Sequence, residues 1–317
     1  TWGRPLGNER ESRIRGVPIR RWPLAPIDLL ALLALGSGIA LIVSRYTTVL
    51  HYQWDWLSLG GAVLHWDPTH RTWDTGLLLR GFLATVRLSV WSSILMGLFG
   101  AVFAFCRISG SVYLRLVGGT YVGFVRNMPL LVFLFLFYFV LSGQLFPLLG
   151  LDNLGRGMGP IAARWVTVFF GSPQELPAFV TGAICLALFE GAYVAEILRA
   201  GLQAVPRGQW EAALSLGLSR RAALWRVVAP QAVRESLPAL AGQVILLIKA
   251  SSVASLISIP ELTYMANEIS SSNNHVFETW IAAAGLYLFL CFGCATVFSR
   301  LERRALAGIH PATRARA

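Results

Sequence analysis

Six apolar runs, each close to the length that a helix needs to cross a lipid bilayer, dominate this sequence. A hydrocarbon core about 30 Å thick requires roughly 20 consecutive apolar residues in a helix. Hydrophobic residues make up 55% of the chain and charged residues 14%, whereas a soluble domain carries about 25% charged residues. The sequence therefore predicts an all-α integral membrane protein with about six transmembrane helices. We expect these at Pro26–Ser44, Leu83–Phe105, Met128–Phe146, Ala178–Leu198, Leu237–Ile259 and Thr279–Phe298.

The arginines predict how the chain is oriented in the membrane. Loops that carry Lys and Arg close to the ends of spans stay in the cytoplasm. On the side of the two termini, the N-terminal tail carries six arginines, the segment after the second run two, the segment after the fourth run six and the C-terminal tail five. The segments on the opposite side carry five arginines. We therefore expect both termini in the cytoplasm. This placement accounts for the net charge of +11, so the lipid bilayer is an expected partner and nucleic acid is not.

Composition also divides the chain into parts. We expect a basic cytoplasmic tail over 1–25, an extra first span with a Trp-rich periplasmic loop over 26–77, a transmembrane core over 78–303 and a second basic tail over 304–317. Because tryptophan favours the headgroup region, the loop is expected to lie on the outer membrane surface as a short amphipathic piece. The spacing of its His and Asp residues matches no ligand pattern, so no metal site is predicted.

A polar segment, 205–235, separates the fourth and fifth apolar runs. Pro206 suits the first position of a helix, and good helix formers continue to Leu216. Gly217 can adopt the left-handed conformation that ends a helix, and Ser219 can cap a second helix that ends at Pro230. The sequence therefore predicts a short helix–turn–helix at the cytoplasmic surface.

Two interpretations of this segment are open from its pattern. Ala212, Ala213 and Leu216 are expected on one helix face, where small side chains let another backbone approach closely. Glu211 offers an anchor for a basic group of a partner. An amphipathic helix that lies on the membrane surface is the alternative.

The residues of this segment resemble the cytoplasmic signature of ABC import permeases. That signature is Glu-Ala-Ala, three residues, Gly, nine residues and Ile-x-Leu-Pro. "EAALSLGLSRRAALWRVVAP" follows it, with Val227 in place of Ile and Ala229 departing from Leu. The resemblance implies a coupling helix that docks on an ATPase subunit. The matching residues are Glu211, Ala212, Ala213, Gly217 and Pro230.

The flanking sequences narrow the resemblance. "GAYVAEILRAGLQAVPRGQWEAA" and "FVRNMPLLVFLFLFYF" resemble the polar amino-acid branch of these permeases, the histidine/glutamine type. The extra first span and the long outer loops resemble the general L-amino-acid subgroup. The similarity covers about Leu78–Arg303 and implies the type I ABC importer permease architecture in the bacterial inner membrane.

The resemblance also implies the partners. It predicts an ATP-driven importer of polar or general L-amino acids in which this chain forms half of the translocation pathway. The complete transporter would also contain two ATPase subunits, a second permease subunit (a paralogue or an identical copy) and a periplasmic amino-acid-binding protein. The one lysine, Lys249, does not follow a glycine, so the chain lacks a Walker A loop. ATP and Mg²⁺ are expected on the partner, and no cofactor, catalytic residue or enzyme activity is predicted here.

Ionisable residues within apolar runs are costly and mark candidate functional positions. Glu196, close to the cytoplasmic end of the fourth run, is expected to pair with Arg199 in a structural or gating role. Glu190 lies deeper, beside Tyr193. It could receive a substrate ammonium group, or pair with Lys249 or Arg87 of a neighbouring run.

Further polar residues are candidates for a substrate pathway. The fifth run carries Gln243, Lys249, Ser251 and Ser255, and with Ser258 its serines would form one helical stripe, either a passage wall or interhelical hydrogen bonding. Ala250 stands where the family typically has an acid. Arg126 and Asn127 open the third run, where the resemblance suggests a gating or structural role and a snorkelling arginine is the alternative.

An ion-coupled secondary transporter is the rival function. It would use Glu190, Arg87 and Lys249 as an ion relay, and it would transport without an ATPase. It leaves the cytoplasmic signature unexplained.

Overall fold

The computed structural model describes residues 26–45, 52, 54–67, 71–153 and 155–307. The chain separates into two units, Thr1–Trp54 and Asp55–Ala317. In the first unit, α1 (Pro26–Arg45) occupies the first predicted run. Its apolar part, Pro26–Leu41, is shorter than the spans of the second unit. The expected tail over 1–25, and 308–317 of the second expected tail, lie outside the described residues.

Five helical segments of the second unit are long and apolar enough to cross a membrane. They overlap the second to the sixth predicted runs, of which the third begins two residues before its span and the fifth ends two residues after its span. The last, α13 (Val276–Ala307), continues as helix beyond residue 304, where the sequence placed the start of a tail. The first, α3 (Leu77–Ile108), has 32 residues and is about 48 Å long. The five segments are Leu77–Ile108, Leu130–Leu148, Pro173–Ala204, Arg220–Ile257 and Val276–Arg304.

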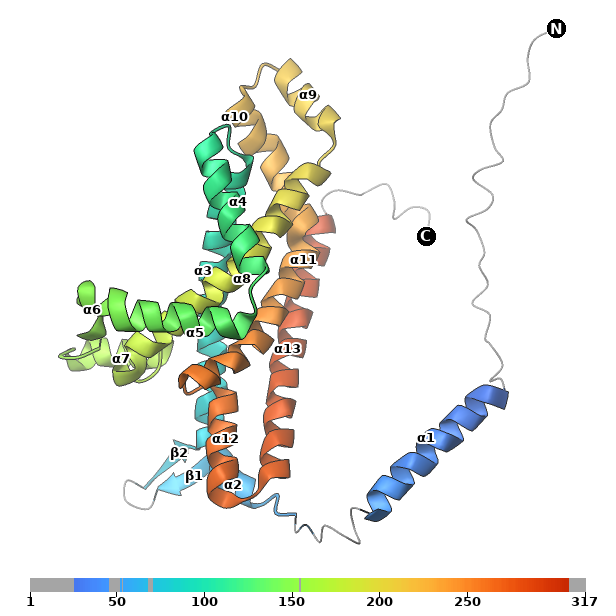
Figure 1. Ribbon diagram of the computed structural model, residues 1–317, viewed down its shortest axis with the longest axis vertical. Coiled ribbons are helices and arrows are strands. Elements are labelled where there is room, and N and C mark those ends of the chain that lie inside the picture. The colour runs from blue at the N-terminus through green and yellow to red at the C-terminus, as the bar shows by residue number, and fades with distance from the viewer. Residues whose placement is uncertain (1–25, 46–51, 53, 68–70, 154, 308–317) are drawn as a thin grey trace. The chain divides into compact units, whose positions relative to one another are not determined.

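The central helix of this unit is α8 (Leu176–Ala204), which packs against α3 and against α11 (Ala229–Ala250) (Figure 1). Glycines let α3 and α8 approach closely. A Cβ at Gly100 would lie 2.3 Å from Val194 Cγ1, and one at Gly191 would lie 3.1 Å from Phe99 Cβ. Contacts between small residues of this kind favour helix association in membranes, where burial from water no longer drives it.

A helix between the second and third spans was not expected from the sequence. α4 (Val112–Arg126) follows the second span and packs on α3 and α8. Arg126 is its last residue and Asn127 its C-cap, so the prediction that these two residues open the third span is wrong. The amphipathic α4 lacks the continuous apolar run that marked the other helices, and it was therefore treated as a loop.

The third span is itself interrupted. α5 (Leu130–Val140) runs across the bundle rather than along it in Figure 1. A π-helical turn, η2 (Leu141–Leu145), and the short α6 (Phe146–Leu148) continue it.

The segment between α6 and α8 is largely helical. It contains the 3₁₀ turns η3 (Leu151–Asn153) and η4 (Pro173–Glu175) and the helix α7 (Pro160–Phe169). Arg87 Nε donates to Val168 O at 2.9 Å, and Trp91 Nε1 donates to Phe169 O at 3.0 Å. Carbonyls in the last turn of a helix have no partner within it, so these α3 side chains fix the end of α7.

The Trp-rich loop forms a short helix and a β-hairpin. α2 (Ser58–Val63) leads into β1 (Leu64–Asp67), which pairs antiparallel with β2 (Thr72–Thr75). Trp66 lies opposite Trp73, and their rings meet edge to face with centroids 5.6 Å apart. Cross-strand aromatic pairs stabilise hairpins. The all-α prediction therefore holds for the membrane helices, and the hairpin is an addition to it.

The fifth span does not remain α-helical to its end. After α11 the chain forms a 3₁₀ segment, η6 (Ser251–Ile257), turns at Ser258 with φ +61°, and enters α12 (Leu262–Asn273). The hydroxyls of Ser251 and Ser255 donate to the carbonyls of Ile248 and Ser252, each at 2.7 Å. The predicted α-helical serine stripe is therefore wrong, because serine side chains that bond to their own backbone compete with regular helix.

Candidate coupling segment and membrane-embedded polar groups

The polar segment between the fourth and fifth spans forms a helical hairpin at one end of the bundle, where α9 and α10 are seen in Figure 1. α9 (Arg207–Ser215) is followed by its C-cap Leu216 and then by Gly217, whose φ is +80°. The Gly217 N–H donates to Leu214 O at 2.9 Å, and the Leu218 N–H donates to Ala213 O at 3.2 Å. This is the left-handed C-terminal motif that the sequence predicted for Gly217.

The second helix of the hairpin begins as predicted and ends differently. The Ser219 side chain accepts from the Ala222 N–H at 3.3 Å and caps α10 (Arg220–Ala223). A π-helical turn, η5 (Leu224–Val228), follows and leads into α11, so the prediction that the helix ends at Pro230 is wrong. The Ala229 N–H donates to Leu224 O. The π turn shifts the bonding by one residue directly before Pro230, and the helix continues past the proline.

The expected single face of α9 is divided between the inside and the surface. Ala213 is 3% exposed, whereas Glu211, Ala212 and Leu216 are exposed. Neighbouring helix positions point in different directions, so Ala213 cannot share a face with Ala212. The Gln231 side-chain amide donates to Gln209 Oε1 at 3.3 Å and joins α9 to α11. The buried cluster beneath the hairpin contains Val205, Val228 and Ala232, with Leu202, Trp210 and Leu224 packed against it.

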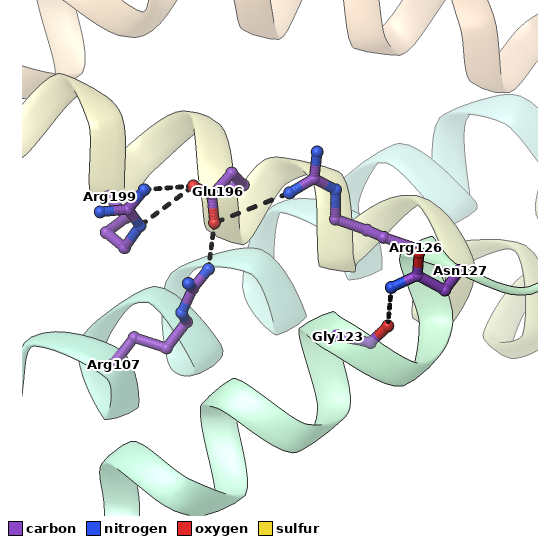
Figure 2. Close-up of polar contacts among 6 residues, drawn as sticks. All are labelled: Arg107, Gly123, Arg126, Asn127, Glu196 and Arg199. Carbon is purple, nitrogen blue, oxygen red and sulfur yellow. Dashed lines mark hydrogen bonds and ion pairs between the residues drawn. The ribbon is translucent and has the colours of Figure 1, made fainter.

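Glu196 is the centre of an ionic cluster that joins three helices (Figure 2). Its carboxylate accepts hydrogen bonds from Arg107 of α3 and from Arg199 of α8, whose Nε lies 3.1 Å from Oε1. Arg126 Nη1 of α4 lies 3.9 Å from Oε2. The predicted pair with Arg199 is present. Arg107 and Arg126 were missed because they are far away in the sequence, and no local pattern indicates such pairs.

The end of α4 is fixed beside this cluster. The Arg126 guanidinium lies over the Tyr193 ring, 5.5 Å from its centroid, a favourable cation–π geometry. Asn127 Nδ2 donates to Gly123 O at 2.7 Å. Nearby, the Tyr121 hydroxyl donates to the Leu188 carbonyl, and burial raises the pKa of Tyr121. Tyr193 therefore belongs to the junction between α4 and α8.

Glu190 is 5% exposed and accepts a hydrogen bond from Gln243 Nε2 of α11. Neither of the ionic partners that the sequence proposed for it is used. Arg87 donates to the end of α7, and Lys249 is exposed. The contact with Gln243 was missed, although both residues stood among the pathway candidates.

A second buried acid, Glu261, directly precedes α12. It is fully buried and caps α12 by accepting from the Tyr264 N–H at 3.0 Å. Thr85 Oγ1, at 3.2 Å, and the Tyr287 hydroxyl also donate to it. Burial raises the pKa of Glu261, and these hydrogen bonds oppose the shift. Glutamate is not among the preferred N-cap residues, so no local signal in the sequence indicates this role.

The helical hairpin of α9 and α10 and the packed spans can be compared with those of known proteins. Residues 93–306 match the family described as the inner membrane component of binding-protein-dependent transport systems. This chain belongs to that family. It is an integral membrane transport permease subunit of the type I ABC importer fold, and this membership favours the permease interpretation over an ion-coupled secondary transporter.

Individual relatives are similar in sequence to this chain over most of their own length. The L-cystine transport system permease protein TcyB of Bacillus subtilis (strain 168) is 34% identical over 250 residues, which cover 78% of this chain and 94% of the relative. The octopine transport system permease protein OccM of Rhizobium radiobacter is 35% identical over 237 residues, covering 74% and 89%.

Solved structures share the fold. One described as an amino acid ABC transporter with histidines has a TM-score of 0.60 and 31% identity, and the match covers 80% of this chain and all of that chain. The inward-facing MetNI methionine ABC transporter has a TM-score of 0.52 at 16% identity, covering 72% and 96%, and supports the fold alone.

Proposed function

We propose that this chain is the permease subunit of an ATP-driven importer of polar or general L-amino acids. Curated relatives are named for the transport of cystine, glutamine, and glutamate and aspartate. The chain would form half of the translocation pathway, and a second permease subunit, a paralogue or an identical copy, would form the other half. A periplasmic binding protein would deliver the substrate.

The proposed coupling role rests on the exposed surface of α9. Ala213 holds α9 on the bundle, while Leu216 is 82% exposed and Glu211 is also exposed. The hairpin thus leaves an acid and a leucine open at the end of the bundle, within the segment that resembles the signature of ABC import permeases, and this resemblance supports a docking surface here. We assign it to the ATPase subunit, which binds ATP and Mg²⁺.

The connections of α9 suggest how movement would reach the membrane. α8 ends at Ala204, just before α9, and the helix from Arg220 runs without interruption into the fifth span. The Glu196 cluster ties α3 and α4 to α8. A displacement of α9 would therefore move α8 and α11 directly and take α3 and α4 with them, which opens the passage to one side of the membrane at a time.

The pathway itself remains part of this proposal. Its candidate residues lie on α8, α11 and η6, and Arg126, Asn127 and Glu196 would act as a structural or gating junction beside it. We place α9 and both termini in the cytoplasm, in accord with the arginine distribution. The pathway candidates are Glu190, Tyr193, Gln243, Lys249, Ser251 and Ser255.

Uptake by the reconstituted complex tests this function. The complex is placed in proteoliposomes with its ATPase and binding protein, and uptake of radiolabelled L-amino acids is measured with and without ATP. We expect uptake that requires ATP, the ATPase and the binding protein. Uptake driven by an ion gradient in the absence of the ATPase would contradict the proposal.

A further inference from the structure

A cavity of about 510 Å³ lies at one end of α3. This end is remote from the coupling hairpin, which is formed by α9 and α10. Its walls come from the first turns of α3, the end of α7 with the following turn η4, and the turn before α12. Ile108, at the other end of α3, lines a pocket with Trp210 of α9. Residues 80–87 lie about 30–40 Å along α3 from Ile108, so the cavity opens on the opposite side of the membrane from the coupling surface.

Charged groups of both signs line this cavity. Arg80 and Arg87 of α3 contribute guanidinium groups, and Glu175 of η4 contributes a carboxylate. Each arginine is held through its Nε, which donates to Thr75 Oγ1 at 3.2 Å for Arg80 and to Val168 O at 2.9 Å for Arg87. The terminal guanidinium nitrogens are the parts that remain to bind a carboxylate.

The charges do not neutralise one another. Among the residues that the structure describes, no ion pair within 4.0 Å involves Arg80, Arg87 or Glu175. Two cations and an anion that line one cavity without pairing are suited to a ligand that carries both charges. Arginine binds carboxylates through paired hydrogen bonds, and a carboxylate accepts from an ammonium group.

The remaining walls suit the rest of such a ligand. Phe170, Phe179 and Ile259 supply an apolar surface beside the charges. Ligand cavities typically measure about 300–1,000 Å³, so the volume accommodates a free amino acid with its side chain and some water.

We propose that this cavity is an outer receiving site that binds the α-carboxylate of a free L-amino acid through Arg80 and Arg87 and its α-ammonium group through Glu175. The proposal rests on the proposed function, since it assumes that an amino acid arrives at this side of the membrane. The site would hold the substrate after its release from the binding protein and before it enters the passage between the permease subunits.

Three substitutions test the site in the complete transporter: Arg80→Gln, Arg87→Gln and Glu175→Gln. Arg164→Gln of α7 and Glu268→Gln of α12 are matched controls, because both side chains are exposed and neither lines the cavity. Arg87 also holds α7, so Arg80→Gln and Glu175→Gln keep the test independent of that contact. We expect each cavity variant to raise the KM for uptake about tenfold and each control to stay within twofold of wild type.

Substrate analogues assign the two charges. The probe is the radiolabelled compound that the wild-type complex takes up fastest among the twenty standard L-amino acids and L-cystine. Its binding to the complex in nanodiscs, without the binding protein, is competed with its α-amide and N-acetyl derivatives. Wild type should prefer the free amino acid over both. The preference over the amide should disappear in Arg80→Gln, and the preference over the N-acetyl form should disappear in Glu175→Gln.

The outcomes separate this inference from the function on which it rests. If the wild-type complex takes up none of these compounds, the proposed function fails. If it does take one up, but the cavity variants keep a KM within twofold of the controls, the receiving site is wrong. A raised KM with unchanged analogue preferences would also overturn it, because the charges would then bind a lipid headgroup or a neighbouring subunit.

Discussion

Glu211 is an exposed acid on α9, at the surface that we assign to the ATPase. Glu211→Gln removes its charge and leaves the packing of Ala213 intact. A hydrogen bond to a charged group contributes about 1.5–3 kcal/mol, so we expect uptake per ATP hydrolysed to fall at least about tenfold while the protein remains in the membrane. ATPase activity and uptake are measured on the same proteoliposomes. Glu235→Gln, an exposed acid on α11, is the control, and unchanged coupling in Glu211→Gln would refute the role of this side chain.

The contact between Glu190 and Gln243 makes a second prediction at the scale of single residues. Gln243→Leu leaves a buried carboxylate without its donor, which costs about 1–3 kcal/mol. Glu190→Gln keeps a pair of side chains that can bond to each other and should destabilise the protein less. Thermal unfolding of the detergent-solubilised complex gives the order of the two variants. A Gln243→Leu protein as stable as Glu190→Gln would show that this contact contributes little to stability.

Residue-scale predictions succeeded where the signal was local. Gly217 and Ser219 follow from turn and capping preferences, and the Glu196–Arg199 pair from helical spacing. Two contacts depend instead on which helices pack together: the one between Gln243 and Glu190 and the one between Arg107 and Glu196. The partners in these two contacts are 53 and 89 residues apart in the sequence. No spacing rule links residues that are so far apart.

At the scale of the helices, the Glu196 cluster is a junction of α3, α4 and α8. Glu196→Gln would leave three guanidinium groups close together without a neutralising charge. The side chains are 23–43% exposed, and because solvent screens the repulsion we expect a loss of about 1–2 kcal/mol. The apparent Tm should fall by a few degrees, and by less in high salt. Glu235→Gln serves again as the control, and an unchanged Tm in both variants would contradict the junction.

Apolar length predicted the long helices but not how they are interrupted. The five long spans follow from runs that only a membrane helix can accommodate. Pro230 was taken as a helix end because an isolated proline usually is one, whereas the π-helical turn before it allows the helix to continue. The serines of η6 were read with α-helical spacing, although their bonds to nearby carbonyls favour a tighter turn. The sequence does not predict α4, because only one narrow face of this amphipathic helix is buried and it lacks a continuous apolar run.

The whole molecule leaves much of its apolar surface uncovered. On α13, Leu288, Phe289 and Phe292 are 70–73% exposed, which lipid or a neighbouring subunit would cover. The proposed pathway residues also differ in exposure: Glu190 and Ser251 are buried, whereas Lys249 is exposed. A passage shared with a second permease subunit accounts for this difference, because residues that are open in one chain would face the partner. Family and fold were predictable at this scale, since the cytoplasmic signature is specific, whereas the outer cavity depends on three separate segments.

The orientation of the molecule yields the last prediction. A coupling hairpin that meets an ATPase must lie in the cytoplasm, and the hairpin β1–β2 and α12 must then lie outside. In a background in which Cys106, Cys185, Cys291 and Cys294 are replaced, we introduce Ser215→Cys in α9 and Glu268→Cys in α12, both exposed positions.

Labelling with a membrane-impermeant thiol reagent distinguishes the two sides. In cells whose inner membrane is intact, Glu268→Cys should react and Ser215→Cys should remain unlabelled until the membrane is permeabilised. Once it is permeabilised, bound ATPase should slow the reaction of Ser215→Cys, because the same surface would be covered. Labelling of Ser215→Cys from outside would place the hairpin on the wrong side of the membrane for any cytoplasmic motor, and the coupling role would then have to be abandoned.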